Sequence, residues 1–278
     1  MKFIEEIIKS RSNPAIKLYA TLKDKKGRDR ESLFLAEGEK LTYEALEAEL
    51  PVVKILVSES KCEKIIPKLR SLAERNLGQN TCVQVLGDDA FLKISTENAP
   101  QGVISIIKHL DFFRQTDIIY KEEFSQNVCG RSIVLSSIRD PGNLGSVIRS
   151  AVAFGVEHII LSSDCADIYN PKTVRGAMGS LFRVKVTRVS DLIRYIEAMH
   201  DNGRKVYSAE LSENAKPLGE INLSRWDAVI IGNEGHGVPD DVSAASDGGI
   251  YIPISSKTES LNASVAAAIF MWEQTKIF

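Results

Sequence analysis

From Arg131 onward, short runs rich in valine and isoleucine alternate with stretches whose apolar residues recur at helical spacing. Strands this apolar, separated by helices, are typical of a parallel sheet that is covered on both faces. The expected strands cover residues 131–138, 157–163, 181–189, 205–211, 226–234 and 248–255, and the expected helices cover residues 145–155, 171–178, 189–203 and 261–276. The sequence therefore predicts a parallel-sheet α/β domain over residues 131–278.

A second, smaller α/β pattern covers residues 1–110. The expected helices are 3–9, 14–26, a helix after the turn at Gly38, and 61–76, and the expected strands are 33–36, 52–59, 82–87 and 102–108. The polar stretch 111–130 separates this pattern from the next one. We therefore predict a domain over residues 1–110, a linker over 111–130 and a second domain over 131–278.

The net charge of −2 argues neither for nor against an anionic partner, but the distribution of the charges along the chain favours one. Between Lys9 and Arg30 there are eight lysines and arginines against two aspartates, and a second basic stretch runs from Lys172 to Arg194. Clustered cations in a near-neutral protein can form a phosphate-binding face. A solvated helix face is the alternative that the charge pattern leaves open.

The cysteines exclude two classes of protein. The four of them, Cys62, Cys82, Cys129 and Cys165, are widely separated, with no C-x-x-C pair and no histidine at ligand spacing. This pattern predicts no metal site, no disulfide scaffold and reduced thiols. The amino terminus carries early acidic residues unlike a signal peptide, and no apolar run reaches transmembrane length. We expect a cytoplasmic protein without a membrane anchor.

The commonest ligands of a parallel sheet have sequence signatures that this chain does not contain. Dinucleotide binding needs G-x-G-x-x-G at the first strand-to-helix turn, and the glycines of GNEGHG at 232–237 have the reverse spacing. The P-loop pattern and the G-x-S-x-G elbow of serine hydrolases do not occur either.

Three loops that follow strands carry the candidate site residues, because open α/β sheets bind ligands at the carboxyl ends of their strands. The first loop (residues 139–149, RDPGNLGSVIR) has an expected turn at Pro141 and Gly142. The second loop (230–239, IIGNEGHGVP) has three glycines that let backbone approach a ligand closely. A carboxylate at Glu234 would repel phosphate, so we expect a neutral or cationic ligand there.

Individual residues of these loops have a structural interpretation and a functional one. Arg149 lies in an otherwise apolar helical stretch, where a guanidinium needs a partner or a task. In the first loop, Asn143 is suited to a capping position. In the third loop (251–270, YIPISSKTESLNASVAAAIF), Ser260 precedes Asn262 and Ser264, which are suited to capping the last helix and need have no other role.

The three loops together resemble a known family. NLGSVIRSA, IIGNEGHGVP and IPISSKTESLNASVAAAI are similar, in this order and spacing, to the three motifs of the SpoU/TrmH-type RNA ribose 2′-O-methyltransferases of the SPOUT superfamily. Residues 13–46 also resemble the amino-terminal RNA-recognition domain of that family, an L30e-like α/β unit. The resemblance implies a carboxyl-terminal SPOUT domain with a deep trefoil knot, a feature too rare for periodicity to indicate.

The resemblance also implies a cofactor, S-adenosylmethionine, held bent in the knot with its adenine in an apolar slot. The cofactor carries a positive sulfonium and no phosphate, which agrees with the ligand type expected at the second loop. By motif correspondence, the expected cofactor contacts are Gly232, Ile252 and Leu261, with Ala209, Glu210 and Leu211 after the preceding strand. No metal is required.

In the same family, the residue that matches Arg149 is assigned to activation of the ribose 2′-hydroxyl. A guanidinium of pKa above about 12 is a poor free base, so we expect Arg149 to hold the target phosphate and stabilise the developing alkoxide. Asn143, Glu234, Ser260 and Asn262 would position Arg149, the ribose and the phosphate. The alternative is that Arg149 is only a structural ion-pair partner of Glu234.

Partners follow from the resemblance as well. The family builds its active site at a two-fold interface, so we expect a homodimer in which Arg149 serves its own or the partner's cofactor. RNA would lie across residues 9–30, and the separate amino-terminal domain favours 23S ribosomal RNA over transfer RNA. A non-catalytic RNA-binding protein on the same scaffold and an antibiotic-resistance methyltransferase are the alternatives. His236 is expected to be a solvated residue.

Overall fold

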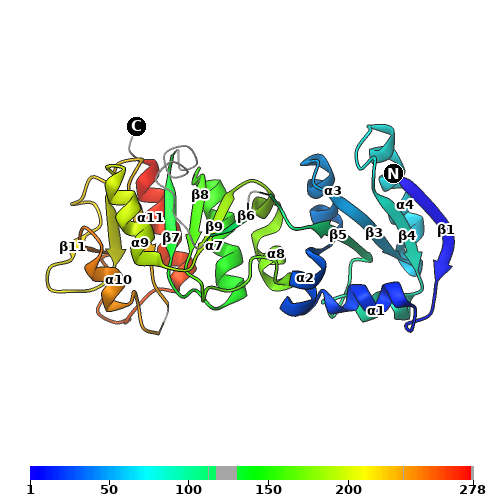
Figure 1. Ribbon diagram of the computed structural model, residues 1–278, viewed down its shortest axis with the longest axis horizontal. Helices are drawn as coiled ribbons and strands as arrows, with labels where there is room; N and C mark the ends of the chain where they lie inside the picture. Colours follow the sequence, from blue (N-terminus) through cyan, green and yellow to red (C-terminus); the bar gives the residue numbers. More distant parts are fainter. Residues whose placement is uncertain (112, 117–129, 234, 277–278) are drawn as a thin grey trace. The chain divides into compact units, whose positions relative to one another are not determined.

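The computed structural model describes residues 1–111, 113–116, 130–233 and 235–276. It contains two compact units, shown in Figure 1. The first unit combines Met1–Leu110 with Asp167–Phe182, and the second combines Asp111–Ala166 with Arg183–Phe278. A segment from the middle of the predicted second domain therefore packs in the first unit.

The first unit has a mixed five-stranded sheet in the order β1-β4-β3-β5-β2. Its strands are β1 (Lys2–Ile8), β2 (Leu33–Glu37), β3 (Val52–Ser58), β4 (Cys82–Leu86) and β5 (Val103–Lys108). Strand β5 runs antiparallel to β2 and β3, whereas β1, β4 and β3 are mutually parallel. The helices are α1 (Pro14–Thr21), α2 (Lys25–Glu31), α3 (Glu39–Glu47), η1 (Glu59–Lys61), α4 (Cys62–Glu74) and α5 (Asp88–Ile94).

Two predictions for the first 31 residues meet different outcomes. The helix predicted at 14–26 is present as α1, which Asn13 caps through a bond from Ala15 N at 2.9 Å, followed by α2. The helix predicted at 3–9 is wrong, because these residues form β1. Pairing with β4 gives the backbone of β1 its hydrogen bonds, and this tertiary contact overrides a weak local preference.

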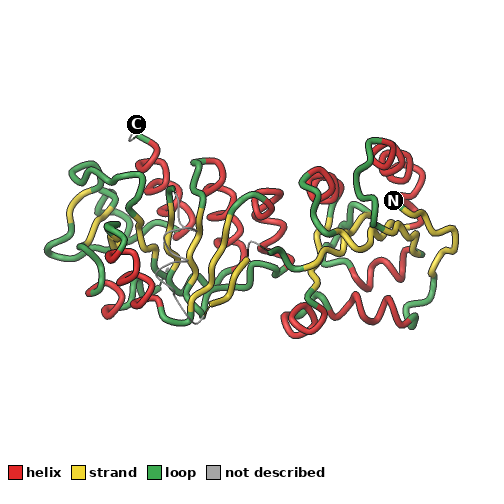
Figure 2. The backbone as a smooth tube through the Cα atoms, turned by 45° about the horizontal axis from the view of Figure 1, so that its top comes forward, coloured by secondary structure: helices red, strands yellow, loops and turns green. Residues whose placement is uncertain are grey.

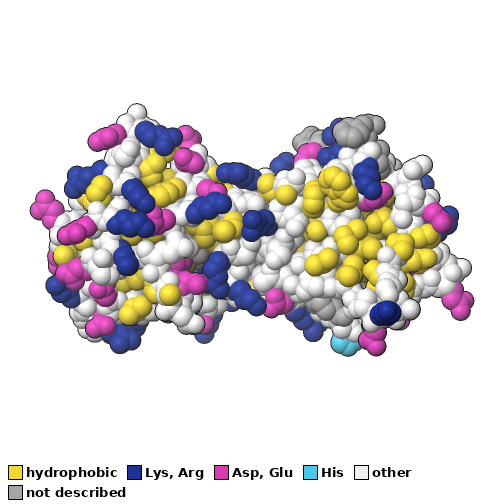
Figure 3. Space-filling model, turned by 180° about the vertical axis from the view of Figure 1, so that it is seen from behind, with side chains coloured by type: hydrophobic (Ala, Val, Ile, Leu, Met, Phe, Trp, Pro, Cys, Tyr) yellow, Lys and Arg dark blue, Asp and Glu magenta, His cyan; other side chains and the backbone are white. Residues whose placement is uncertain are grey.

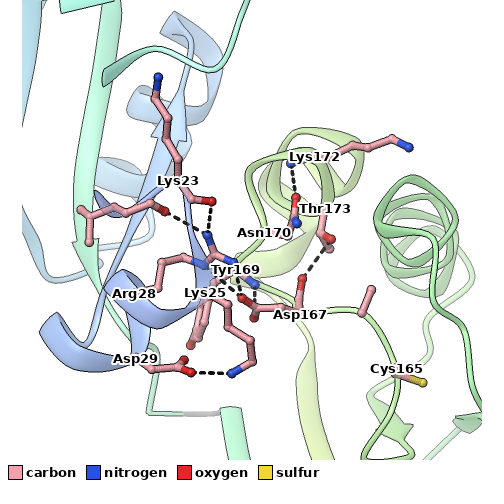
Figure 4. Close-up of polar contacts among 12 residues, drawn as sticks. Lys23, Lys25, Arg28, Asp29, Cys165, Asp167, Tyr169, Asn170, Lys172 and Thr173 are labelled. Atoms are coloured by element: carbon pink, nitrogen blue, oxygen red, sulfur yellow. Dashed lines mark hydrogen bonds and ion pairs between the residues drawn. The ribbon is translucent and has the colours of Figure 1, made fainter. Parts of the chain in front are cut away.

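The segment 167–182 is held in the first unit by a buried ion pair, which Figure 4 shows, and by stacked rings. The Arg28 guanidinium, whose side chain is only 2% exposed, donates to Asp167 Oδ2 at 2.7 and 3.0 Å. Tyr169 stacks between Phe34 and His109, and its hydroxyl accepts a bond from Leu110 N at 2.7 Å. The segment continues as α8 (Pro171–Ala177) and η2 (Met178–Phe182), so the predicted helix at 171–178 is confirmed.

The second unit has an eight-stranded sheet in the order β11-β13-β10-β12-β7-β8-β9-β6. Its strands are β6 (Phe113–Thr116), β7 (Ser132–Leu135), β8 (His158–Leu161), β9 (Lys185–Val189), β10 (Val206–Ala209), β11 (Lys216–Pro217), β12 (Ala228–Ile231) and β13 (Gly249–Tyr251). All neighbouring pairs of these described strands are parallel, which confirms the predicted parallel sheet. Strand β6 lies inside the predicted linker, of which residues 112 and 117–129 fall outside the described residues.

Helices cover both faces of this sheet, as Figure 2 shows. On one face, α9 (Leu192–Asp201) and α10 (Asp240–Ala244) pack on a core that includes Val134, Ile160 and Ile230. On the other, α7 (Pro141–Ala153) and α11 (Ala263–Thr275) pack against each other. The described helices include none long and apolar enough to cross a membrane. The trefoil knot stays a prediction.

Candidate functional site

The first loop enters α7 through a capped turn of helix. Asp140, not Asn143, is the N-cap, and its Oδ1 accepts a bond from Asn143 N at 2.8 Å. Pro141 occupies the first helical position, where its missing N–H costs nothing and its fixed φ favours the helix. The predicted turn at Pro141 and Gly142 is therefore the first turn of α7, and the capping role predicted for Asn143 is wrong. The side chain of Asn143 is left for another contact.

That contact is with the third loop. Asn262 caps α11, since its Oδ1 accepts bonds from Ser264 N at 2.9 Å and from Ser264 Oγ at 2.6 Å. Its Nδ2 donates to Asn143 Oδ1 at 3.1 Å. The capping role predicted for Asn262 is confirmed, and the same side chain joins the third loop to the first.

A cavity of about 260 Å³ lies at the carboxyl ends of β10, β12 and β13, between the second and third loops. Its walls are mainly apolar: Ile231, Ile250, Ile252, Ile254, Leu261 and Phe270. The six residues predicted as cofactor contacts all line it, namely Gly232, Ile252, Leu261, Ala209, Glu210 and Leu211, and Ser260 lines it too. Segments about 50 residues apart along the chain thus form one pocket.

The second loop is folded tightly on itself. Asn233 and Gly237 exchange backbone hydrogen bonds at 2.9 and 2.8 Å, and Gly237 has a φ of +69°. A Cβ at Gly232 would collide with the backbone of Gly237 and Val238. Glycine is needed at 232 because the loop's own backbone passes over it, whereas the sequence analysis expected this freedom to serve a ligand.

Carboxylates contribute to the wall of the cavity. Glu210 Oε2 accepts bonds from Ser208 Oγ at 3.0 Å and from Ser243 Oγ, which fixes its side chain. Glu259 also lines the cavity, whereas Glu234 lies outside the described residues. Fixed negative charge beside an apolar slot suits a ligand that is positive and carries no phosphate.

Arg149 is exposed on α7 and does not line the cavity. Among the described residues, none forms an ion pair or hydrogen bond with its side chain. Six residues separate it from Asn143, which places it about 9 Å further along the helix axis and on a different side of the helix. The guanidinium of Arg149 is therefore available to contact a partner.

The basic stretch 9–30 is only partly available for phosphate. Arg28 is buried in its ion pair with Asp167, so the expectation that it contributes to a surface is wrong. Lys9, Lys25 and Arg30 form exposed pairs with acidic neighbours, and pairs of this kind are weak enough to exchange. His236 is exposed on the second loop, as expected.

Residues 130–272 match the SpoU rRNA Methylase family, and residues 13–105 match the MRM3-like substrate binding domain. The chain belongs to the SpoU rRNA methylase family. Membership in the SpoU rRNA methylase family confirms the predicted SpoU/TrmH resemblance and the predicted enzyme class, an RNA methyltransferase.

Relatives match along almost the whole chain. The 23S rRNA (guanosine(2553)-2′-O)-methyltransferase RlmP of Bacillus subtilis is 34% identical over 95% of this chain and 97% of its own. An uncharacterized tRNA/rRNA methyltransferase of Synechocystis is 29% identical over 96% and 92%. Among solved structures, an AdoMet-bound rRNA methyltransferase from Sinorhizobium meliloti superposes with a TM-score of 0.82 at 26% identity, covering 98% and 97% of the two chains. These similarities confirm the predicted α/β fold.

One group of residues around the site was missed by the sequence analysis. Asn233 lines the cavity and contacts Ser137, which in turn contacts Asp164. Asn233 belongs to the second loop but was not singled out there, and Ser137 and Asp164 lie outside the three loops. The signal they share is position, because Ser137 and Asn233 lie at the carboxyl ends of the predicted strands 131–138 and 226–234, and Asp164 directly follows the predicted strand 157–163.

Proposed function

We propose that this protein transfers a methyl group from S-adenosylmethionine to a ribose 2′-hydroxyl of 23S ribosomal RNA. The observation that carries the proposal is the cavity, because seven of the expected site residues, four of them in the family motifs, line it together with an apolar slot. Similarity to RlmP of Bacillus subtilis, a 23S rRNA 2′-O-methyltransferase, supports both the reaction and the RNA.

The cavity fits the cofactor chemically. Ile252 and Leu261 offer apolar surface for an adenine ring, and Gly232 lines the wall beside them. The fixed carboxylate of Glu210 suits a positively charged group. When bound, S-adenosylmethionine supplies an electrophilic methyl group on a cationic sulfur. The related Sinorhizobium meliloti enzyme was solved with AdoMet bound, which supports this cofactor.

The chain's own residues orient the nucleophile. Ser260 lies in the cavity wall, and the bond between Asn262 and Asn143 fixes the start of α7 beside it. Arg149 is free to hold the target phosphate and to stabilise negative charge on the ribose oxygen as it reacts. Most of the rate then comes from holding the hydroxyl in line with the methyl group. Glu234 is proposed to help position these groups.

A second copy of the chain is proposed to complete the site. Arg149 lies on a side of α7 away from Asn143, so a partner's cavity is the better destination for its guanidinium. Beside it, α7 and α11 form an apolar groove lined by Phe154, Val265, Ala268, Ile269 and Trp272. Val265 is 47% exposed and Trp272 is 52% exposed. Figure 3 shows hydrophobic side chains gathered on the face that carries these helices. An exposed apolar face of this kind is typical of a surface that another protein chain covers, and in a homodimer the same face of both chains meets at the two-fold axis.

The first unit is proposed to bind the RNA, because residues 13–105 match a substrate-binding domain. A dedicated substrate domain favours ribosomal RNA over transfer RNA, and we place the reaction in the cytoplasm, where a bacterial-type ribosomal RNA is modified. Transfer RNA methylation and RNA binding without catalysis are the two alternatives.

The test is to incubate the protein and S-adenosylmethionine with unmodified 23S RNA and with unmodified transfer RNA, and then to map ribose methylation. We expect methylation at a single 23S nucleotide and none in transfer RNA. Methylation of transfer RNA alone would show that transfer RNA, and not 23S RNA, is the substrate. Cofactor binding without transfer to either RNA would identify a binding protein.

A further inference from the structure

The second loop is tied to a neighbouring strand end by the side chain of Asn233. Asn233 lines the cavity, and its Nδ2 donates to Ser137 O at 3.0 Å, just after β7. Its Oδ1 accepts a bond from Gly235 N at 2.9 Å, and its backbone pairs with Gly237. One side chain therefore sets both the internal fold of the loop and its distance from β7.

Ser137, whose carbonyl accepts the bond from Asn233, has a strained backbone conformation. Ser137 has a φ of +59°, a left-handed conformation that a residue other than glycine adopts only at a cost. Ser137 N donates to Ser162 Oγ at 2.9 Å, and Ser137 Oγ donates to Asp164 Oδ2 at 2.7 Å. These two bonds hold Ser137 in the conformation that presents its carbonyl to Asn233.

Asp164 holds the side chain of Ser137 and is itself held by further hydrogen bonds. Its carboxylate also accepts bonds from Ser162 Oγ at 2.6 Å and from the Arg139 guanidinium at 3.0 Å. Partial burial opposes its ionisation, but the hydrogen bonds from Ser162, Ser137 and Arg139 outweigh burial and lower the pKa of Asp164 to about 2. Asp164 is therefore an anion throughout the neutral range and accepts these bonds permanently.

The loop that carries Asp164 is itself immobilised. The Arg188 guanidinium donates to the carbonyl oxygens of Ser163, Cys165 and Ala166 at 2.7–2.9 Å. One half-buried cation thereby fixes the backbone on both sides of Asp164. Movement of Asp164 relative to the sheet would break several of these bonds together.

We infer that Asn233 and Asp164 are positioning residues of the cofactor site, acting as a chain in which Asp164 holds Ser137, Ser137 holds Asn233, and Asn233 holds the glycine loop at the cavity wall. This inference rests on the proposed function, because it assigns the chain's effect to S-adenosylmethionine. Neither residue touches the reacting atoms. Their effect is on how tightly and in what orientation the loop presents its backbone to the cofactor.

The first test is Asn233→Asp, which keeps the acceptor for Gly235 N and replaces the donor to Ser137 O by a carboxylate oxygen. We expect the Kd and the KM for S-adenosylmethionine to rise about ten-fold, the effect of losing one hydrogen bond of ordinary strength, with a smaller change in kcat. Lowering the pH should partly reverse the loss, because a protonated carboxyl group can donate to Ser137 O.

Asn202→Asp is the matched control. Asn202 Nδ2 donates to Ala198 O at 2.8 Å at the end of α9, so the same substitution removes the same kind of bond at a residue that does not line the cavity. We expect its Kd for S-adenosylmethionine to stay within about two-fold of the wild type. An equal rise in Kd for both variants would overturn the inference.

The second test is Asp164→Asn, alone and combined with Asn233→Asp. Residues that act in one chain show non-additive effects, so the double variant should bind the cofactor about as weakly as Asn233→Asp alone. If the losses of cofactor affinity in the two single variants multiply in the double variant, the inference is overturned. Unchanged Kd values and thermal midpoints in both single variants would also overturn it. If the wild type neither binds S-adenosylmethionine nor methylates RNA, the proposed function fails instead.

Discussion

Asn262 Nδ2 donates to Asn143 Oδ1 at 3.1 Å and thereby joins two helix starts that are 119 residues apart along the chain. The same Asn262 side chain caps α11 through Ser264. Ser260 and Leu261, the residues just before it, line the cavity. The first loop is therefore held against the cavity wall by one amide that also fixes the direction of the last helix.

Asn262 variants can separate the capping role from the link to Asn143. Asn262→Ala should lower the free energy of unfolding by about 1 kcal/mol and reduce methyl transfer. Asn262→Ser keeps a good N-cap, but a hydroxyl is too short to reach Asn143. We expect its stability to stay within about 0.5 kcal/mol of the wild type while methyl transfer still falls at least about ten-fold. Denaturant unfolding and transfer of labelled methyl measure the two effects. Full activity of Asn262→Ser would show that the link is dispensable.

Arg149→Ala should abolish methyl transfer and leave cofactor affinity nearly unchanged. The reason is that Arg149 is exposed on α7 and outside the cavity, so removing it alters the handling of RNA and not the cofactor slot. Calorimetry with S-adenosylmethionine and single-turnover methylation of RNA are the measurements. Arg225→Ala, at an exposed arginine outside both basic stretches, is the control and should keep its activity. A large loss of cofactor binding in Arg149→Ala would contradict its assignment to the RNA.

Gly232→Val should eliminate cofactor binding, because a side chain at Gly232 collides with the backbone of Gly237 and Val238. Since Asn233 and Gly237 exchange backbone hydrogen bonds, the loop has little freedom to move aside. Calorimetry measures the loss, and Gly203→Val is the control for a general loss of stability, because Gly203 has open space but a φ of +71°, so a side chain is strained there, away from the cavity. Tight cofactor binding by Gly232→Val would mean that the cavity is not the cofactor site.

These two variants together test the dimer. If Arg149 serves the partner's cavity, a mixed dimer of Arg149→Ala and Gly232→Val chains contains one intact site. Random mixing should then restore about a quarter of wild-type activity, since half of the dimers are mixed and each has one of two sites. Each variant alone is inactive. No recovery on mixing, with dimers present by light scattering, would place Arg149 in its own chain's site.

Much of the candidate site was predictable because the motifs that carry the family resemblance are local in the sequence and follow predicted strands. The strand ends that carry Gly232 and Ile252 follow valine- and isoleucine-rich runs, and parallel strands bring their carboxyl ends to one edge. The contact of Asn233 with Ser137 was not predictable, because it uses a backbone carbonyl whose direction depends on a left-handed φ. Strand β1 was missed for a similar reason, since its hydrogen bonds come from β4 and not from its own residues.

The packing of segment 167–182 in the first unit could not be predicted from the sequence either, because it depends on the ion pair between Arg28 and Asp167, which are far apart along the chain. The side chains of Arg28 and Asp167 are 2% and 15% exposed, so removing one leaves a largely buried charge. We expect Arg28→Ala to lower the free energy of unfolding by about 3–5 kcal/mol. Arg30→Ala removes a guanidinium that is paired with Glu31 and 57% exposed, and should change it by less than about 1 kcal/mol. Urea unfolding of both variants measures the difference, and equal effects would contradict a structural role for the pair.

The burial of the His158 ring makes the free energy of unfolding depend on pH. Its ring is buried in β8, with Nε2 at 2.8 Å from Thr187 Oγ1. Burial, with Lys185 and Arg204 nearby, lowers the pKa of His158 to about 4. The unfolded chain takes up this proton near pH 6.5 and the folded chain does not, so folding is favoured above that pH and progressively less between pH 6.5 and 4. The loss over this window is about 3 kcal/mol. Urea midpoints at pH 7 and pH 4.5 should therefore differ more for the wild type than for His158→Gln, which carries no titrating ring. An identical pH dependence in the two proteins would show that His158 is protonated in the folded state.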